Sequence, residues 1–126
     1  MIDDRSSADP LIESIRSGKV PDDELVSLLN HKSVLVRANV YELAASRAKL
    51  DSSWIPRLRA AAVDARSGQV VMGTVRLSHI AVACLLRIGN RQAVQLAEDL
   101  IARWPEPEKD DLLWYLRSQS LWSKSV

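Results

Sequence analysis

The fold follows from one stretch of the chain, Leu28-Leu29-Asn30-His31-Lys32-Ser33-Val34-Leu35-Val36-Arg37-Ala38-Asn39-Val40-Tyr41-Glu42-Leu43-Ala44. Two leucines close a short apolar segment, and a polar turn follows them. Ser33 is a favoured residue at a helix start, and the apolar residues after it stand at 36, 40, 43 and 44, on one helix face. The stretch therefore predicts two consecutive helices joined by a tight turn.

Helical periodicity continues on both sides of this stretch, and no run of residues reads as a strand between turns. We expect about six or seven helices, which begin near Pro10, Pro21, Ser33, Ser52 or Ser53, Val70, Asn90 and Glu108. The helix from about Val70 to Ile88 is apolar nearly all round, so it is predicted to be the central one. The predicted core contains Leu43, Val75, Val82, Leu85 and Leu100.

A weak internal repeat accompanies this pattern, because Val36-Arg37 recurs as Val75-Arg76, 39 residues further on. The leucine pair, the polar turn and the Val-Arg opening resemble the HEAT repeat, although His31 and Ser33 stand where that family often has an aspartate. The resemblance covers residues 20 to 104. It implies an all-α fold, a short right-handed α-solenoid of antiparallel helical hairpins, in which Arg37 and Arg76 bond to neighbouring turns.

The domain organisation expected from this resemblance is a single HEAT-like domain over residues 1–126. Within it, residues 1–9 form a flexible N-terminus, residues 10–19 an N-terminal cap helix and residues 108–126 a C-terminal cap helix. The 126 residues fit one domain, with 47% hydrophobic and 26% charged residues.

The composition also limits which cellular compartment and which kinds of partner are expected. The net charge of +1 gives no global attraction to nucleic acid, and Cys84 is the only cysteine, so no disulfide forms within the chain. No signal peptide and no apolar run of membrane-spanning length is seen. We therefore predict a cytoplasmic protein without a membrane partner; secretion by a route without a signal peptide stays open.

Neither a catalytic group nor a cofactor is expected. The glycines are scattered rather than gathered in a phosphate loop, and His31 and His79 have no second ligand at metal-binding spacing. His79 and Cys84 lie in the apolar helix, where a core histidine and an inert thiol are the expected readings. The predicted catalytic, cofactor and metal sites are therefore none.

The last helix departs from the pattern of a terminal cap, which should expose a polar face to solvent. Leu112, Leu113 and Leu116 fill one stripe, while the aromatic residues and Leu121 fall beside it. Aromatic residues are enriched at binding hot spots, and the acids before them would form a rim. The predicted partner-binding residues are Trp114, Tyr115, Trp122, Glu108 and Asp111; the alternative is that the three rings pack into the core.

Two functions follow. The first is a non-enzymatic protein-binding module. One class that fits is a bacterial immunity or antitoxin protein, which binds and blocks a toxin. Self-association through the last helix is an alternative use of the same residues. The second is a HEAT-like nucleic-acid-binding or DNA-repair protein, for which Arg57, Arg59, Arg66, Arg87, Arg91 and Arg103 are the basic residues. The nucleic-acid function is the less favoured of the two, since proteins that bind many phosphates normally carry a larger excess of positive charge.

Overall fold

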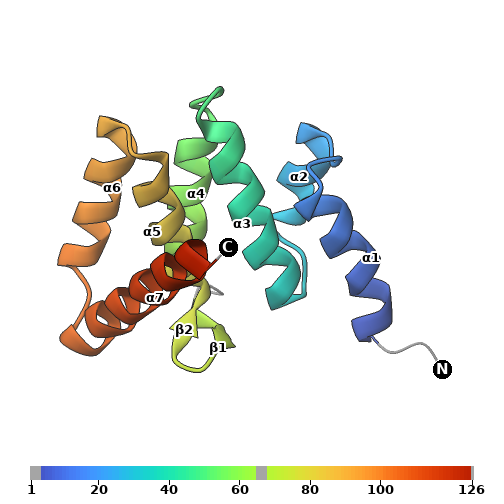
Figure 1. The fold of residues 1–126 in the computed structure, drawn as a ribbon. Coiled ribbons are helices and arrows are strands. Elements are labelled where there is room, and N and C mark those ends of the chain that lie inside the picture. Colours follow the sequence, from blue (N-terminus) through green and yellow to red (C-terminus); the bar gives the residue numbers. More distant parts are fainter. Residues whose placement is uncertain (1–3, 65–67, 126) are drawn as a thin grey trace.

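The computed structural model describes the backbone of residues 4–64 and 68–125 and the side chains of residues 10–64 and 68–118. These residues form seven helices and one short hairpin of strands (Figure 1). In chain order the elements are α1 (Asp4–Arg16), α2 (Asp22–Leu28), α3 (Val34–Ala48), α4 (Trp54–Val63), β1 (Val70–Met72), β2 (Val75–Arg76), α5 (Leu77–Ile88), α6 (Arg91–Ala102) and α7 (Glu106–Ser125). The predicted all-α class is confirmed.

The helices are arranged in space in the order of the sequence. Helix α1 packs on α3, α3 on α5 and α5 on α7, while α4 lies against both α5 and α6. In Figure 1 the pair α1 and α2 stands at one end, α3 and α4 in the middle, and α5 and α6 at the other end. Each pair thus covers an apolar face of the next. The right-handed superhelical course expected of a solenoid stays a prediction.

Polar contacts join the successive helices as well. Arg16 Nε donates to Asn39 Oδ1 at 3.0 Å between α1 and α3, and Arg87 pairs with Glu42 between α5 and α3. Arg47 Nη1 lies 2.6 Å from Asp22 Oδ1 and fastens the α1–α2 turn to α3. These pairs are partly exposed, so they fix the register of neighbouring helices more than they stabilise the fold.

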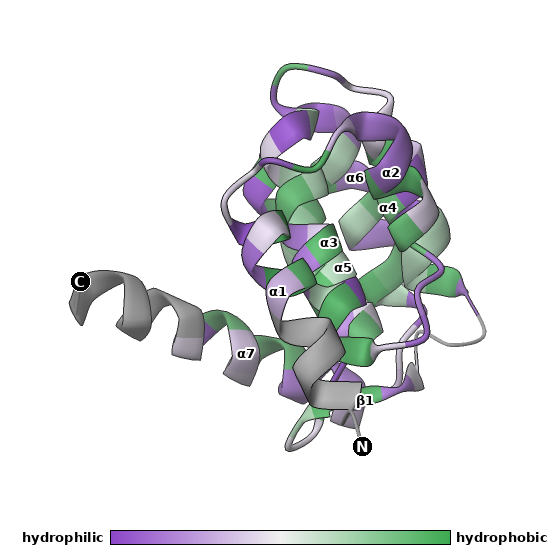
Figure 2. Cartoon of the chain, turned by 90° about the vertical axis from the view of Figure 1, so that its right-hand side faces the viewer, coloured by the Kyte–Doolittle hydropathy of each residue, from purple (hydrophilic) through white to green (hydrophobic). Residues whose placement is uncertain are grey.

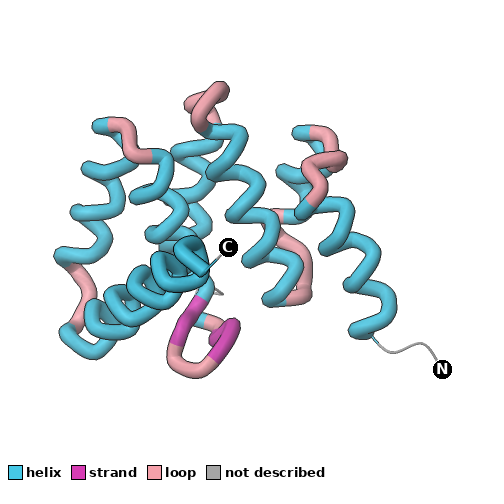
Figure 3. Tube along the Cα trace, viewed as in Figure 1, coloured by secondary structure: helices cyan, strands magenta, loops and turns pink. Residues whose placement is uncertain are grey.

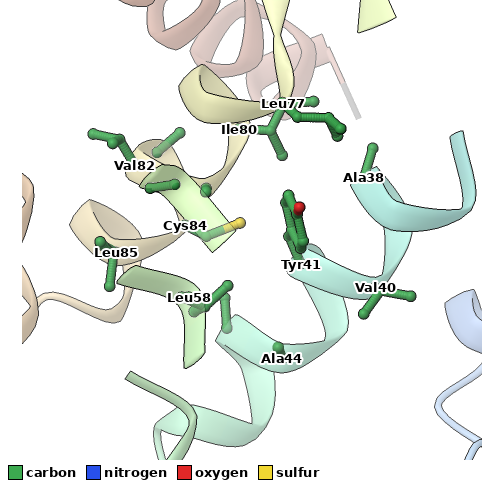
Figure 4. Packing of buried hydrophobic residues seen from close by; sticks show 14 of the residues in the cluster. Ala38, Val40, Tyr41, Ala44, Leu58, Leu77, Ile80, Val82, Cys84 and Leu85 are labelled. Atoms are coloured by element: carbon green, nitrogen blue, oxygen red, sulfur yellow. The ribbon is translucent and has the colours of Figure 1, made fainter. Parts of the chain in front are cut away.

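Helix α5 lies at the centre of the core, as predicted. Every residue from Leu77 to Leu85 is buried. Figure 4 shows Tyr41 of α3 and Leu58 of α4 pointing toward this helix. Of the predicted core residues, four are buried, namely Val75, Val82, Leu85 and Leu100.

The burial predicted for Leu43 is wrong, because this side chain is only half-buried. Helix α3 is enclosed by α1, α4 and α5, so its buried face is wide. This face includes Tyr41, Ala44 and Ala45 and leaves Leu43 at its edge. Leu43 instead lines an open pocket of about 340 Å³ with Ile15 and other residues of α1 and α3.

Several helix ends follow the predicted signals. Ser33 Oγ accepts the Val36 N–H at 3.3 Å at the start of α3, and Asn90 Oδ1 accepts the Ala93 N–H at 2.8 Å at the start of α6. Gly89 ends α5 with a φ of 75°, a left-handed conformation that glycine adopts without steric cost.

The main correction concerns residues 70–76, which form a hairpin and not the start of the central helix. Strands β1 and β2 pair antiparallel, with Val70 opposite Arg76 and Met72 opposite Val75 (Figure 3). Gly73 takes a φ of 53° at the turn, and β-branched residues flank it. The apolar run hid these features, because a short apolar segment reads equally well as helix or strand.

Three helix boundaries also differ from the prediction. Helix α1 begins at Asp4, so Pro10 lies inside it and not in its first turn, and residues 4–9 of the expected flexible terminus are helical. The pair Ser67-Gly68 predicts the end of the fourth helix, but α4 ends at Val63. Helix α7 begins at Glu106; Pro107 is tolerated there because the first N–H groups of a helix have no internal partner.

Candidate binding surface on the C-terminal helix

The first turns of α7 are fastened to the body through His79. Its Nδ1 accepts the Arg76 N–H at 2.9 Å, and its Nε2 lies 3.0 Å from the Glu108 carbonyl oxygen. Because Nδ1 is an acceptor, the ring proton belongs on Nε2, which donates to that carbonyl. The ring of Trp104 meets the histidine edge to face, with centroids 5.3 Å apart. His79 therefore connects α5 to the segment after α6 and to α7 as a neutral imidazole.

Burial has the largest effect on the pKa of His79, and the polar groups around the ring offset it only in part. Burial lowers the pKa of His79 below the ordinary 6.5, while the Glu108 carbonyl and the Asp111 carboxylate act in the opposite direction. Arg76 Nη1 also lies 3.1 Å from Glu108 Oε1, which gives α7 a second attachment. The first turn of α7 is thus held by one neutral and one ionic contact.

The inward face of α7 is formed by Leu112, Tyr115 and Leu116. Leu112 is 3% exposed, Tyr115 is 6% exposed and Leu116 is half-buried. These positions follow the spacing of three and four residues that places side chains on one helix face. The expectation that Tyr115 faces a partner is therefore wrong, since the rest of the chain already covers its ring.

The outward face carries Leu113 and Trp114, which are 49% and 56% exposed. Asp110 and Arg117 are exposed at helical neighbour positions of this pair. In Figure 2 the coloured part of α7 leaves the body of the molecule while α1 to α6 are gathered together. Leu113 and Trp114, called here the α7 patch, therefore form adjoining apolar surface on a helix that projects from the core.

The structure separates the five residues predicted to bind a partner. Trp114 is exposed and Tyr115 is buried. Glu108 and Asp111 are half-buried beside Arg76 and His79, so they attach α7 instead of forming an outer rim. The Trp122 side chain lies outside the described residues.

Leu113 is the residue of this surface that the sequence interpretation missed. The apolar pattern of the sequence places it on one stripe with Leu112 and Leu116. Adjacent residues on a helix point about 100° apart, so Leu112 and Leu113 cannot face the same neighbour. The available signal was the spacing of four residues between Leu112 and Leu116, which defines one helix face and leaves Leu113 and Trp114 off that face.

Cys84 is buried, as predicted, and each of the two repeated arginines bonds to a side chain further along the chain. Burial raises the pKa of the Cys84 thiol to about 12, so it stays protonated at neutral pH. Arg76 pairs with Glu108, and Arg37 donates to the side-chain oxygen of Gln69. Both arginines thus reach the segment that follows their own helical hairpin.

The basic residues considered for nucleic acid are partly engaged elsewhere. Arg87 pairs with Glu42, and the guanidinium of Arg57 lies over the ring of Trp54, 4.8 Å from its centroid. Arg66 lies outside the described residues.

Two features are absent from the part of the chain that the structure describes. Among those residues, no group of three His, Cys, Asp or Glu side chains is placed to hold a metal ion. Within the same ranges, no helix has both the length and the apolar character that crossing a bilayer requires.

Comparisons of the chain with protein-family models, with curated proteins and with solved structures find no match. The likeness to HEAT repeats therefore rests on the residues quoted above.

Proposed function

We propose that this protein is a non-enzymatic, HEAT-like binding module that contacts a partner protein through the α7 patch. The observation that supports the proposal is the pair Leu113 and Trp114, each about half exposed and adjacent on a helix whose opposite face is buried. Water-exposed tryptophan beside leucine is costly for a monomer. Desolvation of such a side chain at the centre of an interface is a common source of binding energy.

The partner that fits this patch has an apolar pocket with basic groups at its edge. Glu106 and Asp110 are exposed on the first turns of α7, and Glu106 lies 3.8 Å from Lys109 in a loose ion pair. Rim charges of this kind act mainly on the rate of association and on the choice of partner. Arg117, on the following turn, would then favour an acidic group at the other end of the pocket.

The more specific form of the proposal is an immunity-type role, in which the module binds and blocks a toxic protein. It assigns the protein to the cytoplasm, where a single buried thiol such as Cys84 stays reduced. Self-association through the same patch is the competing use. The two are separated by whether a second copy or a different protein covers Trp114.

The test compares four immobilised forms of the chain as bait for proteins of the source cell. The unchanged chain and Leu50→Ala should capture the same protein, because Leu50 is exposed in the turn after α3. Trp114→Ala and Leu113→Ala should lose it. The captured protein is then purified, and its binding is repeated with the two isolated components.

Sedimentation equilibrium of the pure chain gives the second readout. A monomer at concentrations at which the captured protein binds agrees with the proposal. A dimer that Trp114→Ala dissociates would replace it with self-association. Equal capture by all variants would show that the α7 patch is not the contact surface.

A further inference from the structure

The 39-residue repeat has a structural counterpart in two matched contacts. Arg37 and Arg76 are equivalent positions of the repeat, and so are their partners, Gln69 and Glu108. Arg76 Nη1 contacts Glu108 Oε1 at 3.1 Å, and Arg37 Nη2 donates to Gln69 Oε1. In both copies the partner lies 32 residues after the arginine. The two contacts thus differ in the charge of the acceptor.

The less favourable acceptor belongs to the more deeply buried arginine. Arg37 is 2% exposed, whereas the side chain of Arg76 is 44% exposed. Among the described residues, Arg37 has no carboxylate in an ion pair with it, and its Nε has no hydrogen-bond partner. A buried guanidinium with one neutral acceptor is costly, because burial removes water that would otherwise solvate the charge.

A pocket of about 190 Å³ adjoins this charge, between the end of α2, α3 and α4. Arg37 contributes to its wall, together with the exposed Arg57 and with Asn30. Leu29 and Ala60 supply apolar surface, and Asp64 lies on the same wall. Two guanidinium groups and an amide therefore share a small pocket with an apolar side.

We propose that this pocket binds a carboxylate carried on a short apolar stem. The carboxylate supplies to Arg37 the negative charge that Glu108 supplies to Arg76, and Arg57 provides a second guanidinium. Arginine forms strong, directed hydrogen bonds to carboxylates. The Asp64 carboxylate on the same wall opposes any anion, and it opposes a doubly charged phosphate more strongly than a singly charged carboxylate. The stem would contact Leu29 and Ala60.

The test is a nuclear magnetic resonance titration with propionate, with uncharged propionamide as the matched probe. Propionate should shift the amide signals of Asn30 and Ala60 in a saturable manner, and propionamide should not. Arg57→Gln should raise the dissociation constant about tenfold, the factor that corresponds to one lost charge-assisted hydrogen bond. Arg59→Gln, on the same helix and outside the pocket lining, should leave it unchanged.

Gln69→Glu is the decisive variant, because it gives the first copy of the repeat the acid of the second. It should raise the thermal midpoint and abolish propionate binding. Binding that persists in Gln69→Glu, or equal shifts with propionamide, would overturn the proposal, as would the absence of saturable shifts in the unchanged chain. A short blocked peptide with one glutamate distinguishes two sources of the bound carboxylate, a protein side chain and a free organic acid. Tighter binding than propionate indicates an acidic side chain of a protein, and weaker binding a free organic acid.

Discussion

Leu85→Ala tests the central position of α5 in the core. Leu85 is 0% exposed, and its helix packs on α3, α4, α6 and α7. The change removes three carbon groups, which at about 0.8 kcal/mol each amounts to about 2.4 kcal/mol of lost transfer free energy. Neighbours on several sides prevent full collapse of the cavity, so the total loss should be about 3 to 5 kcal/mol. Small domains unfold with about 5 to 15 kcal/mol, so this is a large fraction of the stability.

The assay is urea denaturation followed by circular dichroism, with the midpoint and the slope measured for both proteins. Leu113→Ala is the control, because the same chemical change at a half-exposed position should cost no more than about 0.5 kcal/mol. The midpoint should fall in Leu85→Ala with the slope unchanged. A loss below about 1 kcal/mol for Leu85→Ala would refute the central placement of α5.

Three further predictions concern single side chains. Because burial lowers the pKa of His79, the native state binds fewer protons than the unfolded chain. The free energy of unfolding should therefore have its full value above the ordinary pKa of 6.5 and should fall as the pH drops below 6.5. Urea titrations across that range should show this fall, and the fall should be smaller in His79→Gln. Native Cys84, with its pKa raised to about 12, should react with a thiol reagent only at the rate of unfolding; fast labelling would contradict its burial. Asn90→Ala should lower the free energy of unfolding by about 1 kcal/mol, measured in urea, through loss of the bond to the Ala93 N–H.

The sequence was sufficient for the fold class because local signals agree along most of the chain. Ser33 and Asn90 are strong helix starts, and Gly89 is a strong stop. The hairpin at residues 70–76 was not predicted, because its apolar residues extend the stripe of α5 without a break. The turn at Gly73 is visible only once its positive φ is known.

The exposed face of α7 was predicted in part. Trp114 was expected to be exposed and is, because helical spacing places it opposite Leu112 and Leu116. Tyr115 could not be assigned from spacing alone, since it lies at the border between the two faces. The role of Arg37 also depends on tertiary structure, because its partner Gln69 lies 32 residues away.

The account as a whole depends on the α7 patch, and the most direct measurement is the affinity of the purified partner for Trp114→Ala. The dissociation constant should rise about thirtyfold or more, which corresponds to about 2 kcal/mol at a hot-spot residue. The free energy of unfolding of the isolated variant should stay within about 0.5 kcal/mol of the unchanged chain, since Trp114 is 56% exposed. An unchanged affinity, or a loss of stability as large as the loss of binding, would contradict the account.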